Sequence, residues 1–167
     1  MSAGSSNLAS HALAVGCGYL GRRLATRLLA RDVTVFATTR TGDHLNELAE
    51  LGVQPMLVSV TQPLTLAAIQ PALEAPQLDV YYMVPPGRTG GDPPPPVVVV
   101  EGVTHTLKAL RRANVRRAVL VSSTGVYGET AGRPVTAETD PAPRDPRAEV
   151  LLGGARLWRE AGDAYHV

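Results

Sequence analysis

The chain has 167 residues, of which 44% are hydrophobic and 19% charged, and its formal net charge is +1. This length suits one domain, and the near-neutral charge gives no electrostatic reason to expect nucleic acid as a partner. The single cysteine, Cys17, cannot form an internal disulfide, and no apolar run approaches the ~20 residues that span a bilayer, so we expect a cytoplasmic protein without a membrane segment.

The order of predicted elements in the first half alternates strand and helix. Residues 1–11 are rich in serine and alanine and predict a disordered tail. Short β-branched or apolar runs then predict strands, and apolar residues at helical spacing predict helices. In chain order these are a strand at 12–15, a helix at 20–31, a strand at 33–39, a helix at 43–52, a strand at 54–60, a helix at 64–73 interrupted near Pro71, and a strand at 78–84.

The second half continues this alternation after a proline-rich loop at residues 85–96. A helix is predicted at 98–113, a strand at 117–123, and mostly loop at 128–147. Alternating strands and helices joined by right-handed crossovers predict a parallel sheet with helices on both faces. The expected fold is therefore α/β, a doubly wound Rossmann fold of about five strands in the order 3-2-1-4-5, in three α/β/α layers.

A glycine-rich segment, GCGYLG at residues 16–21, follows the first predicted strand and opens the first predicted helix. Such a segment is either a tight turn alone or a cradle for the phosphates of a nucleotide, and its position at the head of a βαβ unit favours the cradle. Gly16 would permit the turn, Gly18 would let a diphosphate approach the backbone, and Gly21 would let the helix lie close to the sheet. Backbone amides at Tyr19 and Leu20 would then donate to the phosphates.

The end of the second predicted strand indicates which dinucleotide is bound. An acidic residue about 20 residues beyond the glycines would bind the free ribose 2'-hydroxyl of NAD. Here the sequence has Thr38, Thr39 and Arg40, two hydroxyls and a fixed cation that suit the 2'-phosphate of NADP. We therefore expect NADP in preference to NAD; the alternative is that Arg40 is only a solvated surface residue.

With GCGYLG, TTR and VSSTGVYGE at residues 121–129 taken together, the chain resembles the short-chain dehydrogenase/reductase superfamily from residue 12 to about residue 140. The similarity is greatest to its atypical or extended branch, the NAD-dependent epimerase/dehydratase family. The resemblance implies that Ser123 orients a substrate, as the one candidate catalytic residue, and that Tyr127 lines the substrate pocket. The expected cofactor-binding residues are Gly16, Gly18, Tyr19, Leu20, Gly21, Thr39, Arg40, Pro85 and Pro86.

Two departures from that family concern catalysis. The family uses a tyrosine and, one helical turn later, a lysine, but the only lysine here is Lys108, and Ala148 and Leu152 stand where the pair is expected. Ser123 also has a purely structural interpretation, in which its hydroxyl caps the turn that follows the strand.

The resemblance also bears on completeness. Full members continue into a sixth strand and a substrate-binding region, whereas this sequence reaches only GDAYHV. Residues 12–167 are thus expected to form a dinucleotide-binding domain that is incomplete relative to the family, either a fragment or one completed by another chain or a homo-oligomer.

The function expected from the sequence is that of an NADP-preferring oxidoreductase or epimerase-like enzyme acting on an unknown small molecule. The alternative is a non-catalytic NADP-binding module, such as a redox sensor or regulatory subunit, because the tyrosine and lysine pair is lacking. The four histidines fall in separate elements without ligand spacing, so we expect no metal site.

Overall fold

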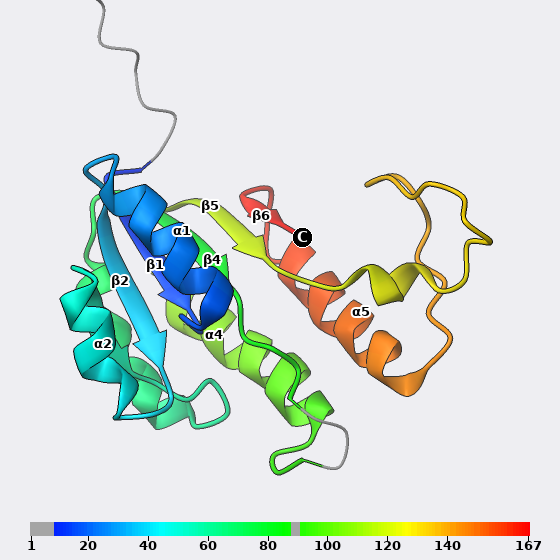
Figure 1. Ribbon diagram of the computed structural model, residues 1–167, viewed down its shortest axis with the longest axis horizontal. Helices are drawn as coiled ribbons and strands as arrows, with labels where there is room; N and C mark the ends of the chain where they lie inside the picture. The colour runs from blue at the N-terminus through cyan, green and yellow to red at the C-terminus, as the bar shows by residue number, and fades with distance from the viewer. Residues whose placement is uncertain (1–8, 88–90) are drawn as a thin grey trace, which may run out of the picture.

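A parallel six-stranded sheet forms the centre of the computed structural model, which describes residues 9–87 and 91–167 (Figure 1). Residues 1–8 of the expected tail and 88–90 of the expected loop lie outside the described residues. The strands are β1 (His11–Val15), β2 (Thr34–Thr39), β3 (Gln54–Leu57), β4 (Leu78–Tyr82), β5 (Val115–Leu120) and β6 (Tyr165–His166). The α-helices are α1 (Tyr19–Leu29), α2 (His44–Glu50), α3 (Gln70–Leu73), α4 (Gly102–Leu110) and α5 (Pro146–Arg159).

The strand order is β3-β2-β1-β4-β5-β6, so the expected order 3-2-1-4-5 is confirmed and gains a short sixth strand beside β5. The strands predicted at 54–60, 78–84 and 117–123 end earlier than expected because their pairing stops at Leu57, Tyr82 and Leu120. Beyond these residues the chain leaves the sheet at its carboxyl edge.

Three helical segments differ from the expectation. The helix expected at 64–73 is a 3-10 helix, η1 (Pro63–Ile69), followed by α3, with Pro71 in the first turn of α3, where its missing amide is harmless. The helix expected at 98–113 begins as the π-helical η2 (Val97–Glu101) before α4. Helix α5 was not among the predicted elements, although its buried residues Ala148, Leu152, Ala155 and Trp158 recur at helical spacing.

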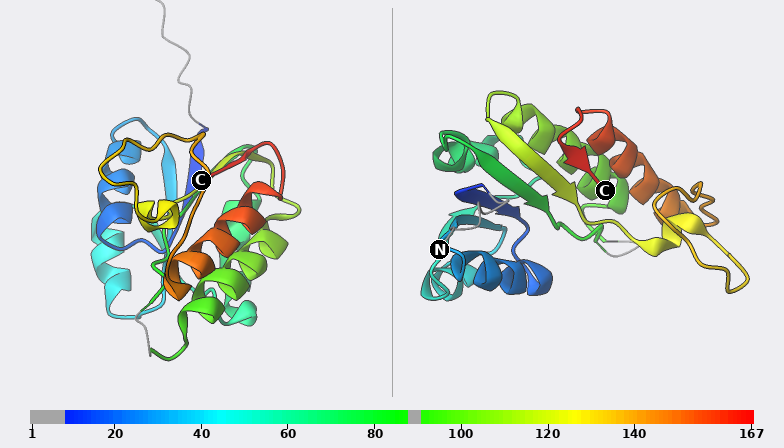
Figure 2. Two further views of the ribbon diagram at one scale, coloured as in Figure 1. Left: turned by 90° about the vertical axis from the view of Figure 1, so that its right-hand side faces the viewer. Right: turned by 90° about the horizontal axis from the view of Figure 1, so that it is seen from above.

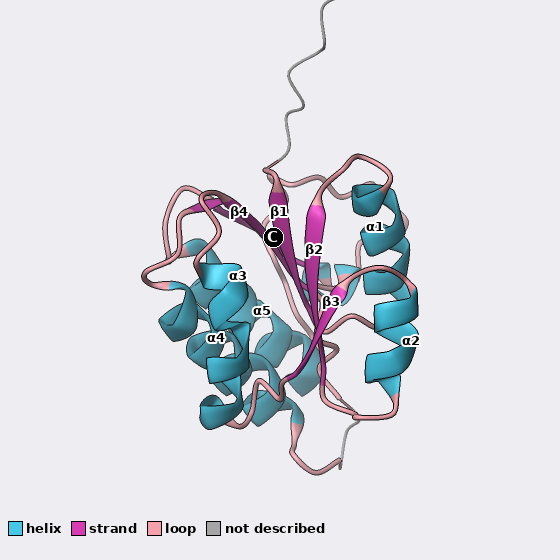
Figure 3. Ribbon diagram, turned by 90° about the vertical axis from the view of Figure 1, so that its left-hand side faces the viewer, coloured by secondary structure: helices cyan, strands magenta, loops and turns pink. Residues whose placement is uncertain are grey.

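Helices α1 and α2 cover one face of the sheet, and α3, α4 and α5 cover the other (Figures 2 and 3). Alternate residues of β1 serve the two layers: Ala12 and Ala14 join the α1 and α2 side, whereas Leu13 and Val15 join the other. The buried residues of the α1 layer include several small ones, Cys17, Ala25 and Ala37 besides the two alanines of β1. Small side chains let α1 lie close to the sheet.

Trp158 anchors α5 beneath β5 and β6. Its side chain is fully buried, and its Nε1 donates to the backbone oxygen of Ala118 at 3.4 Å. Its ring lies 5.4 Å from the rings of both Tyr82 and Tyr165. A Cβ at Gly154 would lie 2.5 Å from Val99 Cγ1, so this glycine lets α5 approach the η2 segment closely.

A buried ion pair holds the amino edge of the sheet together. The Asp79 side chain is 3% exposed and accepts from Arg116 Nε at 2.8 Å. The backbone amide of Ala9 also donates to Asp79, at 3.2 Å. This cluster ties β4, β5 and the segment before β1 together at the edge opposite the glycine segment.

Candidate functional site

The residues predicted to bind cofactor and substrate come together at the carboxyl edge of the sheet. Because all strands are parallel, the segments that follow β1, β2, β4 and β5 leave from this one edge. Strand β1 lies between β2 and β4, where the strand order reverses, and α/β sheets bind ligands at such a position.

Gly16 makes the turn out of β1. Its φ is +81°, a conformation that side chains disfavour, and a Cβ there would lie 2.9 Å from Val84 Cγ2 and 3.0 Å from Val84 N. Its amide donates to Thr38 Oγ1 at 2.9 Å, and the next amide, of Cys17, donates to the Thr38 backbone oxygen at 2.8 Å. The turn is thereby fixed to the end of β2.

Gly18 and Gly21 differ in their surroundings, in the way a diphosphate cradle requires. A Cβ at Gly18 would meet nothing within 4 Å, and Gly18 caps α1 without any side-chain hydrogen bond, so the first-turn amides keep an open approach. A Cβ at Gly21 would instead lie 3.2 Å from Cys17 Sγ and 3.3 Å from Met83 Cε. The residues present therefore fit a bound dinucleotide.

The side chains of the glycine segment suit contact with a ligand better than chemistry. Tyr19 is 76% exposed and Leu20 50% exposed, and the Arg23 guanidinium carbon lies 4.4 Å from the centre of the Tyr19 ring. Cys17 is buried, and burial raises the pKa of its thiol, although the charge of Arg22 acts in the opposite direction. A raised pKa leaves the thiol protonated, which does not favour a nucleophile.

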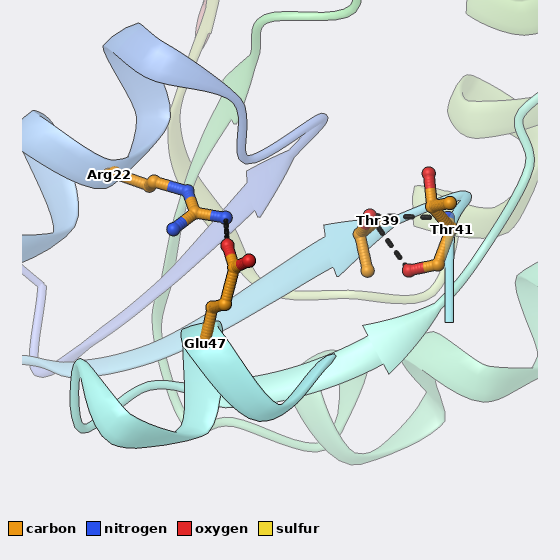
Figure 4. A network of polar contacts seen from close by, with 4 residues as sticks. All are labelled: Arg22, Thr39, Thr41 and Glu47. Atoms are coloured by element: carbon orange, nitrogen blue, oxygen red, sulfur yellow. Dashed lines mark hydrogen bonds and ion pairs between the residues drawn. The ribbon is translucent and has the colours of Figure 1, made fainter. Parts of the chain in front are cut away.

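At the end of β2, the three residues expected to meet a 2'-phosphate are not equivalent. Thr38 is buried and its hydroxyl accepts from Gly16, so the expectation that it faces a ligand is wrong. Thr39 is 8% exposed, and its Oγ1 accepts from the Thr41 amide at 3.3 Å (Figure 4). Arg40 is exposed and has no ion-pair partner within residues 9–87 and 91–167.

Pro85 and Pro86 follow β4 on the same edge. The amide of Met83 still donates to Val15 at 2.8 Å, so the chain leaves β4 directly beside the glycine turn. Pro85 is exposed and Pro86 is partly buried. From the start of α5, Arg147 Nη1 donates to the backbone oxygen of Gly87 at 3.0 Å, which joins this segment to the next part of the site.

Ser123 and Tyr127 line a cavity of about 240 Å³ between the segment after β5 and helix α5. Ser123 Oγ accepts from the Gly125 amide at 3.2 Å, so the capping interpretation of this serine is correct, while its place in the cavity leaves it accessible to a ligand. Sequence reasoning did not indicate Thr139 or Arg159, which also line the cavity, because no local pattern shows that distant segments meet there.

Helix α5 holds the two positions where the resemblance places a tyrosine and a lysine. Ala148 and Leu152 are 3% and 6% exposed, and Leu152 lines the cavity. They lie one helical turn apart on the inner face of α5, but neither side chain can transfer a proton.

Comparison with solved structures agrees with this geometry. A short-chain dehydrogenase/reductase superfamily protein from Agrobacterium tumefaciens, solved with bound NAD, gives a TM-score of 0.73 at 23% identity over 93% of this chain and 46% of that chain. UDP-glucuronic acid 4-epimerase from Bacillus cereus, solved with UDP-glucuronic acid and NAD, gives 0.72 at 18% identity over 93% of this chain and 53% of that chain. These similarities confirm the Rossmann fold.

Sequence comparison gives the family. A ketoreductase from Stigmatella aurantiaca, acting on 4-hydroxy-2-methyl-3-oxo-4-farnesyl-3,4-dihydroquinoline-1-oxide, is 30% identical over 135 residues, which are 80% of this chain and 39% of the relative. This chain thus spans about half or less of the length of the proteins it matches. No helix within the described residues is both long and apolar enough to cross a bilayer. The profile of the NAD(P)H-binding family matches residues 16–148, and the chain belongs to that family, as an NAD(P)-binding Rossmann domain.

Proposed function

We propose that this chain is the cofactor-binding part of an NADP-preferring oxidoreductase of the short-chain dehydrogenase/reductase type. The observation that carries the NADP preference is Arg40, which is exposed, has no ion-pair partner among the described residues, and stands directly after β2 in place of an acidic residue that would bind a ribose 2'-hydroxyl. Gly16, Gly18, Tyr19, Leu20 and Gly21 hold the diphosphate.

Arg40 then receives the 2'-phosphate, Thr39 supports the turn beside it through its hydrogen bonds with Thr41, and Pro85 and Pro86 border the nicotinamide half. When bound, the nicotinamide supplies the hydride. The cavity beside Ser123 and Tyr127 receives the small-molecule substrate, and the similarity to a ketoreductase supports a carbonyl substrate.

In this proposal Ser123 orients the substrate through its hydroxyl, and Tyr127 contacts it from the adjoining turn; both residues line the cavity. Because Ala148 and Leu152 are apolar, the proton of a carbonyl reduction would come from another group, from solvent or from another chain. We place the protein in the cytoplasm, in agreement with its single reduced cysteine.

Titration with NADPH and NADH, followed by nicotinamide fluorescence, tests the cofactor preference. We expect saturable binding of both and tighter binding of NADPH. Arg40→Ala should remove a charge-assisted contact of about 1.5–3 kcal/mol, a 10- to 150-fold loss for NADPH, and change NADH little. Arg31→Ala, which alters an exposed arginine beyond the end of α1, is the matched control. Equal loss of NADPH and NADH in Arg40→Ala would contradict the preference.

A second candidate is a non-catalytic NADP-binding sensor or regulatory module. The buried pair Ala148 and Leu152 favours this candidate, because neither side chain has a group that could donate or accept a proton. Cofactor binding without hydride transfer to a broad panel of carbonyl compounds would support the sensor, whereas turnover by this chain alone would exclude it.

A further inference from the structure

The cavity beside Ser123 and Tyr127 has a charge pattern that the proposed function does not explain. Arg159, the last residue of α5, is the only charged residue among the described residues that line this cavity. The other polar lining residues carry hydroxyl groups: Ser122, Ser123, Thr124, Tyr127 and Thr139. The cavity therefore combines one positive charge with several hydrogen-bond donors, and this combination suits an anion.

The helical face of α5 directs the Arg159 side chain toward the cavity. Leu152 and Ala155 line the same cavity from α5, and residues at i, i+3 and i+7 share one helical face. Helical side chains also lean toward the amino end of their helix, so the Arg159 side chain extends back over the small side chain of Ala155. Figure 1 shows that the segment after β5 runs beside α5, so this face of the helix meets Ser122 and Ser123 across the cavity.

The charge of Arg159 has no partner in the part of the chain that the structure describes. Neither of the two ion pairs found there includes this residue. Three acidic residues, Glu138, Asp140 and Glu160, each stand next to a lining residue in sequence, but none of them lines the cavity. The guanidinium is therefore available to an anion that enters from solvent.

Ser122 gives a second, independent observation. Its Oγ is buried and has no hydrogen-bond partner among the described residues, and Ser122 lines the same cavity as Arg159. A buried hydroxyl without a partner costs free energy, so native proteins rarely leave one unsatisfied. An oxygen atom of a bound anion would supply the missing acceptor.

We propose that the substrate is a small carbonyl compound that carries a carboxylate, a keto acid, and that Arg159 binds the carboxylate. This inference deepens the proposed function and rests on it. Ser123 orients the carbonyl oxygen, as proposed above. The Arg159 guanidinium binds the carboxylate through charge-assisted hydrogen bonds, and the Ser122 hydroxyl gains an acceptor on the same ligand.

Size and charge favour a keto acid over larger or more highly charged substrates. The cavity of about 240 Å³ is smaller than the ~300–1,000 Å³ of pockets that hold drug-sized ligands, so it suits a molecule of few heavy atoms. A carboxylate carries one negative charge, which a single guanidinium neutralises. A phosphate monoester carries about −1.5 to −2 charge at neutral pH and would leave part of that charge unpaired.

Two probes of the same shape, 4-oxopentanoate and its uncharged amide 4-oxopentanamide, isolate the contribution of the carboxylate. Their dissociation constants are measured by calorimetry at low salt with saturating NADP, the oxidised cofactor, which does not reduce the ketone. Wild type should bind the acid about tenfold more tightly than the amide. R159Q should remove most of this difference and leave amide binding within about twofold of wild type.

Arg156 provides a matched control. It is an exposed arginine in the same last turn of α5 but does not line the cavity, so R156Q removes the same charge from the same helix. R156Q should keep the preference for the acid within about twofold of wild type. R159K keeps the charge and loses the guanidinium fork, so it should keep part of the preference, and it replaces R159Q where circular dichroism shows that R159Q does not fold.

S122A tests the second observation. Removing a buried hydroxyl that has no partner should leave the melting temperature of the ligand-free protein unchanged or higher. The same substitution should weaken binding of 4-oxopentanoate about three- to tenfold, because the ligand loses a donor. Undiminished binding of the acid would refute the role of Ser122.

Three results would overturn the assignment of a keto acid. They are equal affinity of wild type for the acid and the amide, equal effects of R159Q and R156Q on acid binding, and tighter binding of dihydroxyacetone phosphate than of 4-oxopentanoate. The third result would replace the carboxylate with a phosphate as the anion that Arg159 binds.

Failure of this inference differs from failure of the proposed function. If NADPH binds saturably in the fluorescence titration but wild type does not distinguish the acid from the amide, only the keto-acid assignment is refuted. If NADPH does not bind, the proposed function is refuted. The comparison of acid and amide on the cofactor-free chain then still shows whether Arg159 binds a carboxylate.

Discussion

Gly18→Ala should weaken cofactor binding about 10- to 150-fold while leaving the fold intact. A Cβ at residue 18 meets nothing within 4 Å, and the backbone there has φ −84°, outside the left-handed region. Alanine restricts the unfolded chain, which stabilises by about 0.4–1 kcal/mol, and is a poorer helix cap by a similar amount, so the two effects nearly cancel. The melting temperature should stay within about 4 °C of wild type.

The substitution should lower the affinity for the cofactor. The new methyl group occupies the space through which the diphosphate reaches the first-turn amides of α1. A hydrogen bond from a backbone amide to a charged phosphate contributes about 1.5–3 kcal/mol, so losing one such bond raises the dissociation constant about 10- to 150-fold. Fluorescence titration with NADPH and thermal melts of the same preparation measure both quantities.

Gly16→Ala is the contrasting variant. The φ of +81° and the 3.0 Å distance from an added Cβ to Val84 N mean that alanine causes backbone strain and displaces its neighbours, at a cost of about 2–6 kcal/mol together, so this variant should melt about 4–20 °C lower.

The Gly18→Ala prediction has a clear contrary outcome. If that variant folds normally and binds NADPH as tightly as wild type does, the amides of α1 do not hold a diphosphate.

Four further predictions concern buried groups. Tyr82→Phe should be neutral or stabilising, since the Tyr82 hydroxyl is buried without a hydrogen-bond partner in the described part of the chain; urea unfolding would measure this. Burial also raises the pKa of Tyr82, so the unfolded chain loses the phenol proton first; wild-type stability should fall above about pH 10, by up to about 1.4 kcal/mol per pH unit, a slope that should be smaller in the variant. Asp79→Ala should destabilise by about 2–4 kcal/mol, because Arg116 and the Ala9 amide lose their partner, and an undiminished urea midpoint would contradict this. Cys17 should react with iodoacetamide more slowly than a free thiol at pH 8 in the folded protein, because burial raises its pKa; an equal rate would show an exposed thiolate.

The sequence was sufficient to predict the fold class and the order of five of the six strands of the described sheet. Apolar runs such as those of β1 and β2 predict strands buried on both faces, and the position of GCGYLG between β1 and α1 predicts a diphosphate cradle. Helix α5 was harder to predict, since Gly154 serves close packing against Val99 in a distant segment and carries no local signal of that role.

The site was predictable only where one short segment determines it. The turn at Gly16 follows from its own backbone, so its role could be anticipated. The role of the Thr38 hydroxyl could not, because it depends on how β1 and β2 align at their ends, and the lining of the cavity by Arg159 depends on how α5 returns beneath the segment after β5. Tertiary contacts between segments that are distant in sequence leave no local pattern in a single sequence.

The alanines beneath α1 act as spacers whose thickness sets the height of the helix. Ala14 and Ala37 stand under a helix whose first turn must meet its ligand to within a fraction of an ångström. A single added methyl group there would lift the whole helix and carry the amides away from the sheet edge. Affinity for the dinucleotide would in this sense depend also on buried side chains that do not themselves touch the ligand.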